Sequence, residues 1–262
     1  TDNGATWSVP IRVADSLAVG TRDPDSNTPV RDSTLVPQIA AAPNGSLYIV
    51  WQDGRFSNGA RDGIALSRSN DGGLTWSAPA QINSNPPVAA FSPFVHVRRD
   101  GMIGVTYFDF RSNTPAPATL PTDYWLARTT DAATWQENRV AQFDLAFAPR
   151  SNATPTPAYF IGDYHALTSI GALFVPFFVQ TNNDNSNRTD VFAAPAISAT
   201  SAAVATEGQD LTTKTVEATT FKVVPAGPVE MTSEFRRRIS DNIVNNLDPA
   251  WYAGWKERNP AQ

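Results

Sequence analysis

Short apolar runs separated by turn residues recur along most of the chain. Residues 47–51 (Leu-Tyr-Ile-Val-Trp) form one run, and residues 103–107 (Ile-Gly-Val-Thr-Tyr) form another. Runs of this length, rich in β-branched and aromatic residues, are typical of buried β-strands. An Asn-Gly pair precedes the first run and an Asp-Gly pair precedes the second, and both pairs favour tight hairpin turns. The pattern predicts an all-β fold built from hairpins.

The two runs belong to a longer internal repeat. Residues 36–55 align without gaps to residues 92–111, so the period is 56 positions. Each copy reads strand, turn, strand and then a loop that carries an Asp-x-Arg sequence, at residues 53–55 and 109–111. Self-similarity at a fixed period of this size is typical of repeat architectures, in which each repeat is one supersecondary unit.

A second motif, S-x-D-x-G-x-T-W, follows the first hairpin. Its Asp can accept hydrogen bonds from turn amides, its Gly permits the chain reversal, and its Trp can bury a large apolar surface. The chain start repeats the spacing without the Ser, whose position would precede Thr1, so we expect further sequence upstream. A third copy is one residue shorter between Asp and Thr. The copies comprise Ser69, Asp71, Gly73, Thr75 and Trp76; Asp2, Gly4, Thr6 and Trp7; and Asp131, Thr134 and Trp135.

These motifs resemble the Asp-box (BNR) repeats of the sialidase (neuraminidase) superfamily, over residues 1–194. A third hairpin begins with Phe-Ile-Gly-Asp-Tyr at residues 160–164 and resembles a blade of the bacterial members. The resemblance implies a secreted β-propeller of four-stranded blades, in an extracellular or periplasmic setting. Family propellers usually have six blades, whereas we count about three. The others would lie upstream, come from another chain, or be missing from a reduced arrangement.

We expect two regions along the chain. Residues 1–195 would form propeller blades, with a closing strand at 1–14 and blades at about 32–84, 88–142 and 155–195. The remainder would be an extension with a strand at about 212–224, an amphipathic helix at about 232–247 and an aromatic tail. The helix is predicted because apolar residues recur every fourth position. These helix positions are Phe235, Ile239, Ile243 and Leu247, and the tail contains Trp251 and Trp255.

Composition excludes several functions. The chain of 262 residues has no cysteine and two histidines, which excludes disulfides, thiol catalysis and the usual Cys- or His-rich metal sites. The net charge of −5 and the scattered basic residues argue against nucleic acid as a partner. No apolar run is long enough for a transmembrane segment. We therefore expect no cofactor or metal, and a glycan or another protein subunit as partner, with peripheral membrane contact through the aromatic tail as a further alternative.

Four residues are candidates for catalysis: Arg55, Arg111, Asp163 and Tyr164. In the resembling family, three arginines hold the substrate carboxylate and a tyrosine is the nucleophile, an exception among glycosidases. The family's F/Y-R-I-P motif is absent, so its first arginine and the acid/base residue cannot be assigned. Arg55 and Arg111 recur at equivalent positions, which favours a structural Asp–Arg pair. Asp163 and Tyr164 break the repeat, although packing remains the commoner role for such residues.

Two functional hypotheses follow. The chain is a glycan-binding or exo-glycosidase-related propeller, and the missing arginine motif counts against catalysis by this chain alone. Alternatively, it is a non-enzymatic scaffold or accessory subunit that docks onto a larger assembly through the propeller and its C-terminal helix and tail. Fold resemblance does not decide between the two.

Overall fold

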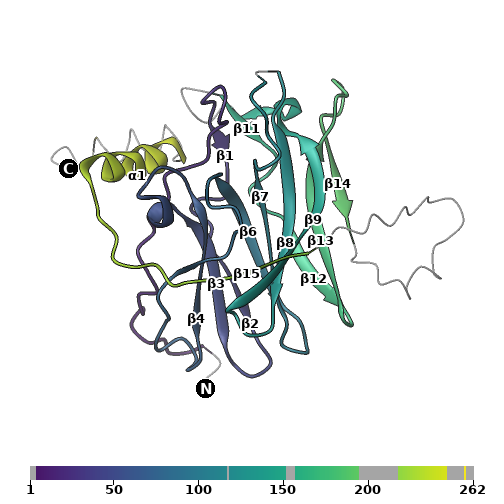
Figure 1. Cartoon of the computed structure of the whole chain (residues 1–262). Coiled ribbons are helices and arrows are strands. Elements are labelled where there is room, and N and C mark those ends of the chain that lie inside the picture. The colour runs from purple at the N-terminus through teal and green to yellow at the C-terminus, as the bar shows by residue number, and fades with distance from the viewer. Residues whose placement is uncertain (1–3, 117, 152–156, 195–217, 247–256, 258–262) are drawn as a thin grey trace, which may run out of the picture.

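The computed structural model describes residues 4–116, 118–151, 157–194, 218–246 and 257. This part of the chain is mostly β-sheet with one α-helix, and its strands form four small sheets, none of them closed (Figure 1). The expected aromatic tail and residues 196–217 lie outside the described residues.

Two of the sheets are antiparallel meanders of four consecutive strands, and they coincide with the first two predicted blades. A fifth strand joins the edge of the second sheet, where it pairs with β9. The first sheet contains β2 (Gln38–Ala41), β3 (Leu47–Asp53), β4 (Gly63–Ser69) and β5 (Ala80–Gln81), and the second contains β6 (Ala90–Val97), β7 (Ile103–Asp109), β8 (Pro121–Thr129), β9 (Thr134–Asp144) and β15 (Thr219–Lys222).

The region predicted as a third four-stranded blade divides into two sheets instead. The strand at residues 158–160 pairs in parallel with a strand near the start of the chain, so it is not available to the hairpin that follows. The third sheet contains β12 (Ala166–Ile170), β13 (Leu173–Thr181) and β14 (Thr189–Ala193); a small upper sheet contains β1 (Val30–Arg31), β11 (Ala158–Phe160) and β10 (Arg150–Ser151).

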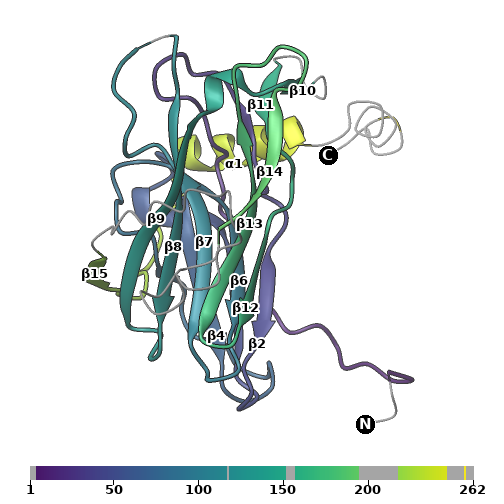
Figure 2. The same cartoon turned by 90° about the vertical axis from the view of Figure 1, so that its right-hand side faces the viewer.

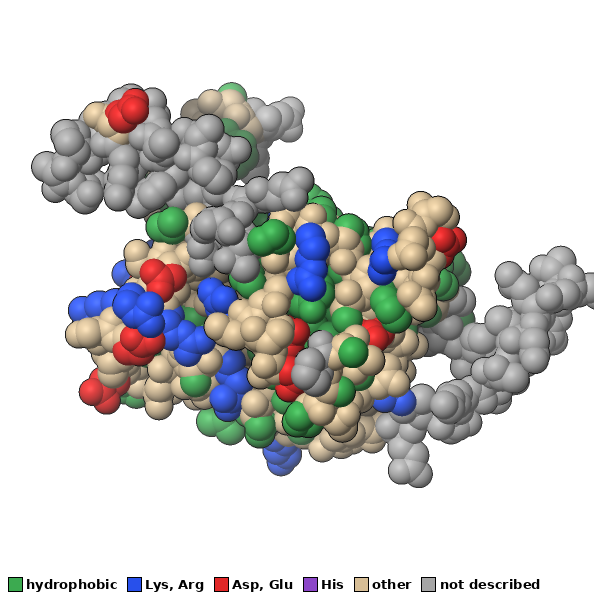
Figure 3. Space-filling view, turned by 90° about the horizontal axis from the view of Figure 1, so that it is seen from above, with side chains coloured by type: hydrophobic (Ala, Val, Ile, Leu, Met, Phe, Trp, Pro, Cys, Tyr) green, Lys and Arg blue, Asp and Glu red, His purple; other side chains and the backbone are tan. Residues whose placement is uncertain are grey.

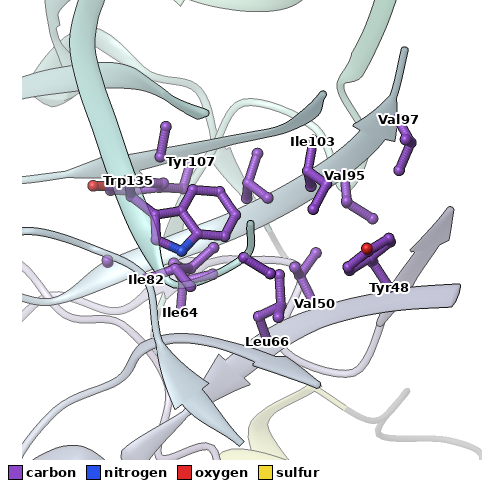
Figure 4. Close-up of a cluster of buried hydrophobic side chains, with 14 of the residues drawn as sticks. Tyr48, Val50, Ile64, Leu66, Ile82, Val95, Val97, Ile103, Tyr107 and Trp135 are labelled. Atoms are coloured by element: carbon purple, nitrogen blue, oxygen red, sulfur yellow. The ribbon is translucent and has the colours of Figure 1, made fainter. Parts of the chain in front are cut away.

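The first three sheets stack face to face. Apolar side chains of the first and second sheets share one core, which includes the fully buried Trp135 and Tyr107 (Figure 4). The opposite face of the second sheet packs against the third sheet, where Leu126 meets Phe174. A Cβ at position 104 would lie 2.6 Å from the Phe174 ring, so only glycine permits this close approach. The second sheet is therefore covered on both faces.

The antiparallel order divides the connections between two ends of the stack. The β3–β4 and β7–β8 loops and the β5–β6 linker lie at the end that carries α1, which we call the upper end (Figures 1 and 2). The β4–β5 and β8–β9 turns, which carry the second and third turn motifs, lie at the lower end. Loops of the upper end form the candidate site described below.

The predicted closing strand is wrong. Residues 4–14 form no strand, and most of them are exposed. Trp7 of the first turn motif is 88% exposed, so it does not bury its ring as the motif predicts; Gly4 and Thr6 are exposed beside it, and Asp2 lies outside the described residues. An extended segment forms a strand only when a neighbouring strand takes up its backbone hydrogen bonds, and none does so here among the described residues.

Helix α1 (Ser233–Asn246) lies within the range predicted for a helix, and β15 lies within the range predicted for a strand. The helix docks on the upper end through Phe235, which is buried against Leu17 and Val19. The Asn242 side chain donates a hydrogen bond to the Ala18 carbonyl, at 3.2 Å. The extension thus packs onto the segment that precedes the first sheet.

Candidate functional site

The complete copy of the turn motif, at residues 69–76, lies at the lower end, and its polar groups hydrogen-bond to one another. The Asp71 carboxylate accepts bonds from the Thr75 amide and hydroxyl at 2.9 and 2.5 Å, and from the Ser69 hydroxyl at 2.7 Å. These bonds, those from Thr75 first, lower the pKa of Asp71 to about 2. The Gly73 amide donates to the Ser69 hydroxyl at 2.8 Å, and the Trp76 indole donates to the Gly73 carbonyl at 3.0 Å. The carboxylate is used within its own turn.

The shortened turn motif between β8 and β9 is organised in the same way. The Asp131 carboxylate accepts bonds from the Thr134 and Ala133 amides, both at 2.8 Å, and from the Thr129 hydroxyl. Its pKa is lowered to about 2, chiefly by the two amides. Trp135 is fully buried in the core between the first two sheets. Both turns stabilise local structure, and they lie at the end opposite α1.

Arg55 and Arg111 occupy equivalent positions after the second strands of the first two sheets. Each binds the aspartate of its own Asp-x-Arg sequence. Each backbone amide and each guanidinium binds the Asp two positions earlier, which is fully buried. In each sheet a tryptophan indole donates to the same Asp, and the guanidinium lies over that tryptophan ring. Neither arginine shares a partner with the other or with Asp163.

A buried group around Arg111 was not predicted from the sequence. The guanidinium binds Glu137 at 2.5 Å and the Tyr107 hydroxyl at 3.1 Å, while Tyr107 and the Ser84 hydroxyl both donate to Glu137. Burial raises the pKa of Glu137 to about 7, while the hydrogen bonds from Ser84 act in the opposite direction. Glu137 and Tyr107 are fully buried, so these groups are out of reach of a ligand.

Asp163 and Tyr164 lie at the upper end, before β12. Two nitrogens of the Arg31 guanidinium donate to the two Asp163 oxygens, at 3.0 and 2.6 Å. Tyr164 is 74% exposed and has no hydrogen bond or ring contact among the described residues. The structure therefore does not bring the four predicted residues together, and we assign no catalytic step to them.

His165 follows directly and lies half-buried between the second and third sheets. Its Nε2 lies 2.5 Å from the Ser92 carbonyl, so this nitrogen carries the proton. Its Nδ1 therefore accepts the hydrogen bond from the Tyr124 hydroxyl, at 2.7 Å. Burial lowers the pKa of His165 to about 4 and raises the pKa of Tyr124. The pair is neutral and positions the start of β12.

A second buried acidic group joins the N-terminal segment to the first sheet. The Asp62 carboxylate accepts the Val19 and Gly20 amides at 2.8 and 2.9 Å. The Gln52 side chain donates to Asp32 at 2.9 Å and to Asp62 at 3.4 Å. Burial, together with the nearby charge of Asp32, raises the pKa of Asp62 to about 8. This group holds residues 17–20, on which α1 docks, against the first sheet.

The upper end carries a cleft of about 430 Å³. It lies between residues 20–27, the β3–β4 loop, the β5–β6 linker, the β7–β8 loop and α1. Three arginines line it, namely Arg22, Arg61 and Arg238, and they come from three separate segments. Seen from above, Lys and Arg side chains gather on the α1 side of this end (Figure 3).

Carbonyl oxygens rather than carboxylates accept the bonds of two of the three arginines, and half-buried Arg128 on β8 likewise forms no ion pair within the described residues. Arg22 donates to the Asn27 carbonyl at 3.1 Å and Arg61 to the Pro86 carbonyl at 2.7 Å. Within the described residues, none of the three forms an ion pair with a carboxylate. A guanidinium has five N–H donors, so most of these donors are left for solvent or a ligand.

The two aspartates of the cleft accept hydrogen bonds from the loops that line it. Asp23 is buried and accepts bonds from the Ser26 hydroxyl and the Asp25 amide, at 2.5 and 2.8 Å. Asp25 accepts the Asn113 side-chain amide at 3.0 Å, which joins the N-terminal loop to the β7–β8 loop. These carboxylates fix the shape of the cleft while the guanidinium groups remain unpaired with acids in the described part of the chain.

Sequence reasoning missed this cleft because its arginines share no motif and no repeat position. Within the described ranges, no group of three or more His, Asp or Glu side chains is placed to hold a metal ion. No helix in those ranges has the length and apolarity that crossing a membrane requires.

No family model matches the chain, and no curated protein matches it. Among solved structures, Hadza microbial sialidase Hz136 is 14% identical with a TM-score of 0.32, over 61% of this chain and 44% of that chain. An exo-beta-1,3-galactanase from Phanerochaete chrysosporium, with beta-1,3-galactotriose, is 11% identical with a TM-score of 0.26, over 67% of this chain and 50% of that chain. The chain thus spans half or less of these carbohydrate-active proteins, and the likeness is too weak to place it in a family.

Proposed function

We propose that the chain is part of a sialidase-like β-propeller and binds an acidic glycan in the upper cleft. In this proposal the first two sheets and the third sheet are blades, and the protein acts outside the cytoplasm. Two observations support blades. The repeat of 56 positions has its two copies on β2–β3 and β6–β7. The turn motifs at residues 69–76 and 129–135 also share one hydrogen-bond pattern, in which the Asp carboxylate accepts the backbone amide of the Thr.

The observation that carries the proposal is the set of arginines in the cleft. Arg22, Arg61 and Arg238 line one hollow and form no ion pair with a described carboxylate. A guanidinium binds a carboxylate through two parallel N–H···O bonds, which gives geometric selectivity as well as energy. An acidic sugar supplies such a carboxylate.

Hydrolysis is not part of the proposal. The Tyr107, Glu137 and Arg111 side chains are bonded to one another in a buried group that no substrate reaches. Asp163 is bound by Arg31, and none of the four residues predicted for catalysis lines the cleft. We therefore propose binding without turnover by this chain alone.

Titration calorimetry with 3′-sialyllactose tests the site. Arg22→Ala, Arg61→Ala and Arg238→Ala should each weaken binding about tenfold or more, because each removes charge-assisted hydrogen bonds worth about 1.5–3 kcal/mol. Arg68→Ala removes an arginine on β4 whose guanidinium contacts the turn at Asp131 at the lower end, and it should leave the affinity unchanged. Equal weakening by the lower-end variant, or none by the three cleft variants, would contradict the proposal.

A scaffold role is the second candidate, and one observation favours it. The outer faces of the first and third sheets expose large apolar side chains, among them Ile39 and Val191. A monomer seldom leaves extended apolar patches open to water. These faces support a docking role that does not depend on the cleft.

A further inference from the structure

The arginine that α1 contributes to the cleft lies within the face by which this helix docks. Among the α1 side chains that the structure describes, Phe235 and Asn242 are buried, and Arg238 and Ile239 are half-buried. These four positions follow the spacing i, i+3, i+4 and i+7, which places them in one stripe along an α-helix. The position of the Arg238 side chain therefore depends on how the helix is docked.

Phe235 joins α1 to two walls of the cleft. Its ring packs with Val19, which directly precedes Gly20 of the cleft wall. The ring also lies against Gly59 of the β3–β4 loop, where a Cβ would be 2.3 Å from it. Arg61 follows two positions later in the same loop and lines the cleft. The contacts of Phe235 thus adjoin the segments that carry the other cleft residues.

Asn242 makes a second contact with the cleft wall, two helical turns beyond Phe235. Its side chain donates a hydrogen bond to the Ala18 carbonyl at 3.2 Å, and its Oδ1 would lie 2.4 Å from a Cβ at Gly20. Gly20 lines the cleft and has a φ of +78°, so glycine suits both the backbone and the close approach. Since Arg238 lies between Phe235 and Asn242 on the stripe, the two contacts fix its place at the cleft.

Few buried apolar side chains hold the docked helix. Among the described residues of α1, Phe235 is the one fully buried apolar side chain, while Ile243 and Val244 are 41% and 38% exposed. The helix has 14 residues, and isolated helices of this length are marginal in water. A segment with few buried apolar contacts opens at a lower free energy than the core does. We therefore expect α1 to undock and unfold while the sheets stay folded.

We infer that the docking of α1 is coupled to ligand binding in the cleft, with Phe235 and Asn242 as positioning residues that act through Arg238. This coupling rests on the proposed binding of an acidic glycan. A ligand held by Arg238 together with Arg22 and Arg61 binds best to the docked state. Coupling is reciprocal, so the factor by which docking strengthens ligand binding is also the factor by which the ligand strengthens docking. Since loss of Arg238 weakens binding about tenfold, saturating ligand stabilises docking about tenfold.

Hydrogen exchange of the full chain, followed by mass spectrometry, tests the coupling. We expect saturating 3′-sialyllactose to slow the exchange of peptides from residues 233–246 about tenfold. In Arg238→Ala, saturating ligand should leave this exchange unchanged, because the bond between ligand and helix is lost. Arg236→Ala is the matched control, since it removes the same charge from an exposed position of α1 and should keep the slowing.

The exchange experiment separates the coupling from the proposed site. Unchanged α1 exchange in a wild-type chain that binds 3′-sialyllactose would overturn the coupling and leave the site standing. A wild-type chain that does not bind 3′-sialyllactose in calorimetry would contradict both. Slowing that persists in Arg238→Ala would overturn the role of Arg238 as the link.

Titration calorimetry with 3′-sialyllactose tests the positioning residues. Phe235→Ala should weaken binding about as much as Arg238→Ala, although Phe235 does not line the cleft. Combining the two substitutions should weaken binding no further, because Arg238 acts only from the docked helix. Asn242→Ala should also weaken binding, whereas Ile243→Ala, which changes an exposed apolar residue of the same helix, should not.

Two measurements keep a general loss of structure apart from loss of positioning. Circular dichroism shows that the sheets of each variant are folded, and Phe235→Met, which keeps a large apolar side chain in the notch, should restore most of the affinity. Wild-type affinity of Phe235→Ala, or additive losses in the double variant, would overturn the inference.

Discussion

At the scale of single residues, hydrogen bonds and ion pairs within the fold determine which charged side chains can bind a ligand. Arg55, Arg111 and Asp163 are each bonded to a partner of opposite charge, which takes up the bonding capacity that a ligand would need. Of the cleft arginines, Arg22 and Arg61 donate to backbone carbonyls, and none of the three forms an ion pair within the described residues. Since an unpaired buried charge is costly, the first group maintains the fold and the second group is suited to binding.

Arg111→Ala should destabilise the fold strongly. The substitution leaves Asp109 and Glu137 buried without their cation, which costs about 3–5 kcal/mol. Urea denaturation measures the loss. Arg237→Ala is the matched control, because Arg237 and both of its carboxylate partners on α1 are exposed. Its cost should be about 1 kcal/mol or less, and equal losses in the two variants would contradict the account.

His165 should make the fold sensitive to acid. Its pKa falls to about 4 in the fold from an ordinary value of 6.5, so between these pH values the unfolded chain binds more protons than the folded chain. The stability of the wild type relative to His165→Phe should therefore fall as the pH drops from 6.5 to 4, by up to about 1.4 kcal/mol per pH unit. Urea denaturation at several pH values measures this difference, and a difference that is constant with pH would exclude the buried neutral histidine.

At the scale of elements, local pattern and long-range pairing contribute differently. The sequence predicts the hairpins β2–β3 and β6–β7 and the helix. Their signals are alternating apolar residues, turn residues and an apolar period of four, and each signal lies within a short stretch of the chain. The pairing of β15 with β9 and of β1 with β11 joins segments far apart, and no local signal marks it. The cleft was missed for the same reason, since Arg22, Arg61 and Arg238 meet only in space.

The docking of α1 depends on a glycine-lined notch. Phe235 is buried there, and a Cβ at Gly59 would lie 2.3 Å from its ring. Gly59→Ala should displace the helix and increase its cleavage in limited proteolysis. Gly45→Ala is the control, because Gly45 also has a positive φ of +86° but no atom lies within 4 Å of its Cβ position. Both variants carry backbone strain of about 1 kcal/mol, so equal cleavage would contradict the steric explanation.

At the scale of the whole molecule, the face-to-face stacking of the sheets determines which sheet faces are covered and where the cleft lies. Each internal interface covers apolar faces, and the outer faces of the first and third sheets expose Ile39 and Val191. The loops at the upper end meet where the first two sheets adjoin, and α1 adds Arg238 to them. The lower end carries the turn motifs, whose carboxylates are used within the turns.

The most direct test of the central claim is the selectivity of the wild-type chain for an acidic sugar. Calorimetric titrations compare 3′-sialyllactose with lactose, two ligands that differ only in the sugar residue that carries the carboxylate. We predict binding of 3′-sialyllactose that weakens as salt is added, since charge pairs at a solvent-exposed cleft are screened, and at least tenfold weaker binding of lactose. Equal affinity for the two ligands, or binding of neither, would contradict an arginine-lined site for acidic glycans.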